Sequence, residues 1–282
     1  MLHGDMLLKL ASGLEENGLL SDETGHILTG YIGSESFLRA VVTVVQKIKA
    51  INPQVRYICD PVMGDFGRYY VPEQLVKIYK EEILPLANVL TPNQFEVEQL
   101  TGTRIDSVEE AQRACSILHD LGVPLVLITS IDFPPSNAGQ SQEFLGMFAS
   151  ERQYSTETRS SYEDEQQIVH IPKLPGQFTG TGDVCAALWL ALTADVKEEK
   201  NSSASSLGLK LEQLAGTMNA IVVRTHQASV VKLQQQGISS LEAKDEVTRK
   251  KIVLSREMQL IQSASDILHP PSKFQATRLS KG

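Results

Sequence analysis

The feature that most constrains the fold is an alternation of short, strand-like runs with longer helical runs. The strand-like runs cover residues 55–59, 87–90 and 123–128, and helical periodicity covers residues 36–50, 72–84 and 107–121. Strands that alternate with helices of this length predict βαβ units and a parallel sheet. The run at 123–128 is apolar throughout, as is typical of a strand buried on both faces. We therefore predict an α/β fold with a central, mostly parallel sheet.

The remainder of the chain continues without a change of composition that would mark a boundary. Residues 132–167 are polar and are predicted to be rich in loops, with one strand at 144–149. Beyond Gly182 the periodicity predicts three further helices, at 183–194, 207–235 and 255–263. Because the pattern resumes after each polar stretch, residues 1–282 are predicted to form a single domain.

The net charge and composition of the chain argue against some classes of binding partner and location. The 282 residues include 26 Lys and Arg and 34 Asp and Glu, a net charge of −8, so the overall basic character of a nucleic-acid-binding protein is absent. No apolar run approaches the ~20 residues of a membrane helix. Asp5 and Lys9 interrupt the first apolar stretch, which argues against a signal peptide. Three widely spaced cysteines without a metal-binding pattern favour a reducing compartment, and we expect a cytoplasmic protein.

Polar residues end each of the three predicted strands. Asp60 follows the first, Thr91 the second, and Thr129 with Ser130 the third. In open α/β sheets ligands bind outside the carboxyl ends of the strands, so these residues are candidates for one binding edge. The alternative is that such residues only terminate strands and cap helices.

A glycine-containing turn precedes the predicted helix at 183–194. Gly180, Thr181 and Gly182 lie directly before Asp183. Glycines at a helix start let backbone N–H groups approach an anion, and the helix dipole adds positive potential. A carboxylate beside such a loop repels phosphate, so it is better suited to accept a proton from an attacking hydroxyl. The alternative is a tight turn with an ordinary acidic residue in the first helical turn.

Two acidic residues lie near the strand ends. Asp65 follows Gly64, and Glu96 lies one helical turn after Asn93. Mg²⁺ that accompanies ATP is typically held by one or two carboxylates together with phosphate oxygens and waters. These two carboxylates are therefore candidates for Mg²⁺, the alternative for Glu96 being a solvated helix face.

Together these segments resemble one family, the ribokinase-like small-molecule kinases, and within it the pyridoxal kinases. The resemblance runs in order from about residue 27 to the end of the chain. Related hydroxymethylpyrimidine kinases share the sheet and the glycine-containing loop but fit the strings at 28–31 and 93–96 less well. The matching strings are Leu28-Thr-Gly-Tyr31, Cys59-Asp-Pro-Val-Met-Gly-Asp65, Tyr70-Val-Pro72, Leu90-Thr-Pro-Asn-Gln-Phe-Glu96, Ile128-Thr-Ser130 and Phe178-Thr-Gly-Thr-Gly-Asp183.

The resemblance implies a ribokinase-like, three-layer α/β/α fold and an ATP-dependent kinase. The implied acceptor is the 5′-hydroxyl of pyridoxal, pyridoxine or pyridoxamine. Asp183 would take the proton of that hydroxyl, and Gly180, Thr181 and Gly182 would surround the transferring phosphate. Tyr31 would stack on the pyridine ring of the substrate.

The resemblance also implies a nucleotide site, two cation sites and a homodimer. Asp65 and Glu96 would serve Mg²⁺, directly or through water. Asp60, Thr91 and Thr129 would hold a monovalent cation, K⁺ or Na⁺. The segment 66–70 would belong to a loop over ATP. The implied ATP-binding residues are Asn93, Glu96, Thr129, Ser130, Leu174, Pro175 and Gly176.

The start of the chain departs from the family pattern. Members of the family open with a strand, a glycine-bearing turn and a helix, which supply contacts to the vitamin. We expect this domain to be N-terminally incomplete, with an intact nucleotide half. An active kinase is the first hypothesis. The alternative is a catalytically impaired isoform that binds nucleotide or pairs with a full-length kinase subunit.

Overall fold

The computed structural model describes residues 3–133, 143–154, 162–194, 206–238 and 245–280. These residues cluster into two compact units. Unit 1 comprises Met1–Pro134, Phe148–Gln167 and Arg278–Gly282, and unit 2 comprises Pro135–Met147 and Ile168–Thr277. The single domain over 1–282 stays a prediction.

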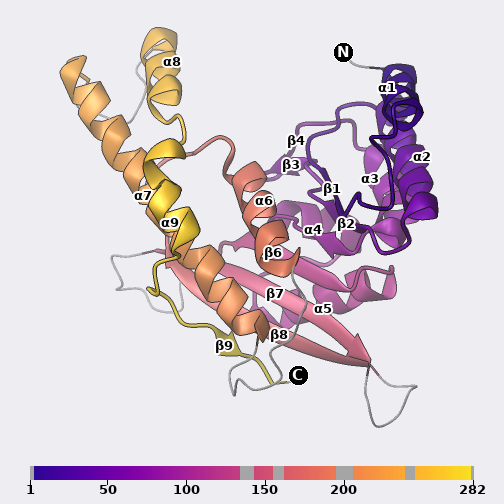
Figure 1. The fold of residues 1–282 in the computed structure, drawn as a ribbon. Coiled ribbons are helices and arrows are strands. Elements are labelled where there is room, and N and C mark those ends of the chain that lie inside the picture. Colours follow the sequence, from indigo (N-terminus) through magenta and orange to yellow (C-terminus); the bar gives the residue numbers. More distant parts are fainter. Residues whose placement is uncertain (1–2, 134–142, 155–161, 195–205, 239–244, 281–282) are drawn as a thin grey trace. The chain divides into compact units, whose positions relative to one another are not determined.

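A seven-stranded sheet has the order β1-β2-β5-β6-β7-β8-β9 (Figure 1). The first four strands in that order pair in parallel, which confirms the predicted sheet. The runs at 55–59, 87–90 and 123–128 correspond to β2, β5 and β6. The bounds are β1 His26–Thr29, β2 Arg56–Cys59, β5 Val89–Leu90, β6 Leu125–Ile131, β7 Phe144–Tyr154, β8 Tyr162–Pro172 and β9 Thr277–Arg278.

The helices of unit 1 begin where capping residues end the preceding loops. The side chains of Ser34, Asn93 and Ser107 accept N–H bonds from the first turns of α2 (Glu35–Ile51), α4 (Gln94–Thr101) and α5 (Val108–Asp120). Such caps satisfy helix-terminal N–H groups that have no intrahelical partner. Helix α1 (Gly4–Glu16) packs against α2. The core of the unit includes Tyr57, Ile58, Val89, Leu90, Val126, Leu127 and Ile128, which are all fully buried.

The helix predicted at 72–84 is wrong in extent. Regular α-helix covers only α3 (Leu75–Ile78) and continues as a π-helical turn, Tyr79–Ile83, and a 3₁₀ turn, Leu84–Leu86. Pro85 lies in the last turn and has no N–H to donate, so the helix cannot continue regularly through it.

A short hairpin, β3 (Gly64–Asp65) with β4 (Arg68–Tyr69), includes most of the segment 66–70 that the family resemblance assigns to a loop over ATP. Phe66 and Gly67 connect the strands with φ of 49° and 73°, the left-handed conformation required by a two-residue hairpin turn. At Gly64 a Cβ would lie 2.2 Å from the Arg68 carbonyl oxygen, so the strands approach this closely only because the residue is glycine.

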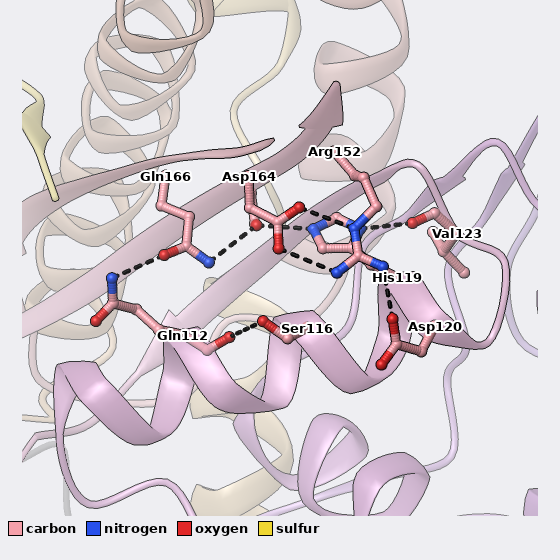
Figure 2. A network of polar contacts seen from close by, with 9 residues as sticks. Gln112, Ser116, His119, Asp120, Val123, Arg152, Asp164 and Gln166 are labelled. Atoms are coloured by element: carbon pink, nitrogen blue, oxygen red, sulfur yellow. Dashed lines mark hydrogen bonds and ion pairs between the residues drawn. The ribbon is translucent and has the colours of Figure 1, made fainter. Parts of the chain in front are cut away.

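A directional chain of hydrogen bonds joins α5 to β7 and β8 (Figure 2). His119 Nδ1 lies 2.7 Å from the Val123 carbonyl oxygen, so this nitrogen carries the proton. His119 Nε2 therefore accepts from Ser150 Oγ at 2.8 Å. Ser150 Oγ accepts from Gln166 Nε2, and Gln166 Oε1 accepts from Gln112 Nε2 at 2.8 Å.

The same region holds an ion-pair cluster and anchors the β9 segment. Arg152 makes two hydrogen bonds to Asp164, at 2.8 and 3.1 Å, and one to Asp120 at 2.6 Å (Figure 2). Gln112 Nε2 also donates to the carbonyl oxygen of Ser280, just after β9. These contacts connect α5 with β7, with β8 and with the residues that follow β9.

Unit 2 is mainly helical. Its helices are α6 (Thr181–Ala194), α7 (Ser206–Gln235), α8 (Glu246–Ser255) and α9 (Ala264–Leu268), and α7 packs against the other three (Figure 1). The helix predicted at 255–263 is wrong, because α8 ends at Ser255 and the predicted range then contains only a 3₁₀ turn, Ile261–Ser263.

The loop-rich interpretation of 132–167 is also wrong in part. The strand predicted at 144–149 is the first half of β7, and the first six residues of β8 fall in the same stretch. The first four of them, Tyr162–Glu165, are exposed or half-buried, so no buried apolar run marked the start of β8. Residues 134–142 and 155–161 lie outside the described part of the chain.

Candidate active site

Backbone hydrogen bonds bring the polar strand ends of unit 1 to one edge. Asp60 N donates to Thr29 O at 2.9 Å, and Thr91 N donates to Cys59 O at 3.0 Å. Thr129 N donates to Pro92 O at 2.9 Å. The first two bonds extend the parallel ladders one residue beyond β2 and β5, and the third joins β6 to the residue that follows Thr91. Asp60, Thr91 and Thr129 therefore lie in neighbouring rows. Ser130 follows Thr129 within β6 and is half-buried.

The start of α4 is tied to the segment that leads into the β3–β4 hairpin. Asn93 Oδ1 accepts from Glu96 N, and the Glu96 carboxylate accepts from Asn93 N, each at 2.9 Å, which forms a capping box. Glu96 Oε1 accepts from Met63 N at 2.9 Å. Asn93 Nδ2 donates to Gly64 O at 2.8 Å, next to Asp65. Asn93 and Glu96 therefore bind the backbone that directly precedes Asp65, and we call these three residues the cluster of unit 1.

The carboxylates in this part of unit 1 lie in surroundings that disfavour their charged form. Glu96 is only 2% exposed, and burial raises its pKa to about 8 despite the opposing backbone N–H bonds. The nearby Asp60 carboxylate raises the pKa of Glu96 further. Burial also raises the pKa of Asp65, against a hydrogen bond from Phe66 N. A cation would compensate this electrostatic cost.

The oxygen donors of these residues suit hard cations whose remaining coordination sites are filled by a bound ligand. Thr91 Oγ1 is buried and has no hydrogen-bond partner in the described part of the chain. Within those same residues, no three His, Cys, Asp or Glu converge to hold a metal alone. One or two carboxylates with phosphate oxygens and water are the usual environment of Mg²⁺. The residues Asp65 and Glu96 fit Mg²⁺, and Asp60 with Thr91 fits a second, monovalent cation.

Sequence reasoning missed Tyr79, whose hydroxyl belongs to the same buried environment. The side chain is 1% exposed, and its hydroxyl has no hydrogen-bond partner among the described residues. Burial raises its pKa, and Cys59, Glu96 and Asp60 add to the effect. The helical pattern around residue 79 predicts only a core position, so the sequence held no signal for a polar role.

Unit 2 carries the glycine-containing loop, which we call the phosphate loop (residues 179–183). Gly180 has a φ of 88°, which glycine adopts without strain. Its carbonyl accepts from Val184 N at 3.1 Å, and Thr181 Oγ1 donates to Phe178 O at 3.2 Å. The first N–H groups of α6 lack intrahelical partners and can bind an anion. Asp183 is exposed in this first turn.

The remaining predicted residues lie at the surface of their own units. Leu174, Pro175 and Gly176 lie in unit 2, just before the phosphate loop, with Leu174 half-buried and the other two exposed. Tyr31 follows β1 in unit 1 and is 60% exposed. Its hydroxyl lies where a Cβ at residue 33 would be 2.8 Å away, so Gly33 leaves room for this ring.

Comparison with known proteins identifies the family. A family model described as phosphomethylpyrimidine kinase matches residues 19–206. The chain is 39% identical over 280 residues to the pyridoxal kinase of Arabidopsis thaliana, covering 99% of this chain and 79% of that protein. It is 36% identical over 283 residues to the pyridoxal kinase of Homo sapiens, covering 99% and 82%. The chain belongs to the pyridoxal kinase family.

Solved structures of pyridoxal kinases agree with this assignment. The pyridoxal kinase of Leishmania donovani in complex with ADP and pyridoxamine superposes with a TM-score of 0.74 at 27% identity, over 98% of this chain and 81% of that one. Its complex with ADP and ginkgotoxin gives a TM-score of 0.76 at 26% identity, over 99% and 82%. The predicted three-layer α/β/α fold of the ribokinase-like pyridoxal kinases is thereby confirmed. None of the helices described is long and apolar enough to cross a membrane.

Proposed function

We propose that this chain is a pyridoxal kinase, which uses ATP to phosphorylate the 5′-hydroxyl of pyridoxal, pyridoxine or pyridoxamine. The observation that carries the proposal is the 39% identity to a pyridoxal kinase over 99% of the chain. The similar solved structure with ADP and pyridoxamine supports both a nucleotide and a vitamer as ligands. The product of the salvage reaction with pyridoxal is pyridoxal 5′-phosphate.

In the proposed reaction Asp183 is the general base. The hydroxyl oxygen of the vitamer forms a bond to the γ-phosphorus of ATP while the bond to the bridging oxygen breaks and ADP leaves. The hydroxyl proton passes to the Asp183 carboxylate, which is exposed at the start of α6. The N–H groups at Gly180, Thr181 and Gly182 stabilise the negative charge of the transferring group, as preorganised donors do at a helix start.

The cluster in unit 1 is proposed to bind the nucleotide and its cations. Mg²⁺, when bound, would neutralise phosphate charge, with Asp65 and Glu96 as its residues. Asp60, Thr91 and Thr129 would hold the monovalent cation. Tyr31 would stack on the pyridine ring, since its ring is exposed. The proposed ATP-binding residues are Asn93, Glu96, Thr129, Ser130, Leu174, Pro175 and Gly176.

The test is turnover of pyridoxal with MgATP, measured as pyridoxal 5′-phosphate formed, in wild type, Asp183→Asn and Asp22→Asn. Asp22 is an exposed aspartate that is not among the proposed site residues, so it serves as the control. We expect Asp183→Asn to lower kcat by roughly 10²–10⁴-fold, the usual share of a general base, with little change in MgATP affinity. Near-normal turnover of Asp183→Asn would exclude the proposed base. A folded wild type that binds MgATP without turnover would favour a non-catalytic nucleotide-binding protein.

We also propose a cytoplasmic homodimer, as the family resemblance implies. Sedimentation equilibrium of the purified chain tests the assembly, and a mass of one chain at micromolar concentration would contradict it. Fractionation of cells that express the tagged chain tests the compartment.

A further inference from the structure

The segment that leads into the phosphate loop, residues 176–178, is held by a residue 79 positions after Gln177. Arg256, directly after α8, donates through Nη1 to Gln177 O at 3.3 Å. Its guanidinium lies over the ring of Phe178, 5.7 Å from the ring centroid. A cation in this position is attracted to the aromatic face, more strongly where water is excluded. The Arg256 side chain is half-buried, so its guanidinium is partly shielded from water, and this burial lowers its pKa.

Gly176 makes this contact possible. It has a φ of 104°, and a Cβ there would lie 2.4 Å from the Arg256 guanidinium carbon. Only glycine allows both the backbone conformation and the close approach. Phe178 has a second contact on α7, where the ring of His226 lies edge to face with its centroid 6.3 Å away.

Arg256 is itself held in place from both sides. Before it, Ser255 Oγ lies 2.6 Å from Ser229 Oγ of α7, and both side chains are buried. After it, Gln259 N donates to Thr225 Oγ1 of α7 at 3.1 Å. The backbone around Arg256 is thus fixed to the longest helix of unit 2, so the guanidinium is presented from a rigid base.

We propose that Arg256 is a positioning residue that holds residues 176–178 and thereby pre-organises the phosphate loop. This inference rests on the proposed function for its catalytic consequence. Arg256 touches neither the loop residues Gly180–Gly182 nor Asp183 in any described contact, so it acts through the segment that precedes them. Ordered N–H donors stabilise a transferring phosphoryl group best when they need no rearrangement, so the effect should fall mainly on kcat.

The experiment compares Arg256→Met, Arg256→Lys and the matched control Arg249→Met. Arg249 is an exposed arginine on α8. Met keeps the apolar stem and removes the charge and the donors, whereas Lys keeps a charge without the planar face. For Arg256→Met we expect kcat with pyridoxal and MgATP to fall about tenfold, the worth of one desolvated cation–π contact with its hydrogen bond. The KM for pyridoxal should stay unchanged, and Arg256→Lys should recover part of the loss.

Hydrogen exchange of the peptide spanning 176–184 gives a readout that needs no turnover. We expect its amides to exchange about tenfold faster in Arg256→Met than in Arg249→Met, because local opening becomes easier. Equal exchange in the two variants would overturn the inference. An unchanged kcat with a lowered melting temperature would also overturn it, since the role would then be structural only. A wild type without turnover would contradict the proposed function, and the exchange rates alone would then decide on Arg256.

Discussion

Replacing Asn93 by alanine should affect stability and nucleotide use together. The side chain caps α4 through Oδ1, which accepts from Glu96 N, and it holds the hairpin strand through Nδ2, which donates to Gly64 O. Alanine removes both hydrogen bonds. The control is Ser107→Ala, since Ser107 caps α5 by accepting from Glu110 N but has no second described partner of this kind.

The expected loss in the free energy of unfolding follows from the hydrogen bonds that each substitution removes. Loss of a cap costs about 1 kcal/mol in either variant. In Asn93→Ala the second hydrogen bond adds about 1 kcal/mol, and the carbonyl at Gly64, which is buried, loses its described side-chain donor and adds up to about 1 kcal/mol more. The free energy of unfolding should therefore fall by about 2–3 kcal/mol in Asn93→Ala and by about 1 kcal/mol in Ser107→Ala.

Urea unfolding at pH 7 measures this difference, and steady-state kinetics with varied MgATP measures its effect on the site. We expect a raised KM for MgATP in Asn93→Ala and an unchanged KM in Ser107→Ala. Asn93→Asp separates the two roles, because aspartate keeps the cap but cannot donate to Gly64 O. Equal destabilisation of Asn93→Ala and Ser107→Ala, with equal KM values, would refute the reasoning.

Three further predictions concern other parts of the fold. Gly64→Ala should yield little folded protein on expression, because its Cβ would collide with backbone of β4. Burial lowers the pKa of His119, so its contribution to stability is present above the unfolded pKa near 6.5 and is lost as pH falls below it. Urea unfolding from pH 7.5 to 5 should therefore show a steeper loss for wild type than for His119→Asn, with exposed His3→Gln as control. A thiol reagent should modify no cysteine within minutes in the native state and all in urea, because the three thiols are buried: Cys59, Cys115 and Cys185.

The parallel half of the fold could be predicted because its strands are apolar and end in polar residues. Residues 125–128 illustrate this, since they are all apolar and form the buried first part of β6. The start of β8 could not be predicted in the same way, because its first residues are polar and partly exposed. The hairpin at Phe66 and Gly67 depends on left-handed backbone at a non-glycine residue, which sequence patterns rarely reveal.

Some residues of the candidate site could likewise be predicted from the sequence, and others could not. Asp60, Thr91 and Thr129 were predictable as a group because parallel strands align their carboxyl ends. The sequence allowed two interpretations of Glu96, a cation ligand or a residue on a solvated helix face. Only the burial of its side chain in the structure excludes the second. The positions of Tyr79 and Arg256 were not predictable, because tertiary packing brings each near residues that are distant in the sequence.

The contact of Arg256 with Phe178 also has a consequence for synthesis of the chain on the ribosome. The phosphate loop is translated about 75 residues before the arginine that contacts its leading segment. At ordinary rates of synthesis this delay is roughly 4–15 s. During that interval α6 can form while residues 176–178 have no guanidinium to hold them. Nascent chains that stall before residue 256 would therefore carry the residues of the phosphate loop without its order, so catalytic competence is acquired late in translation.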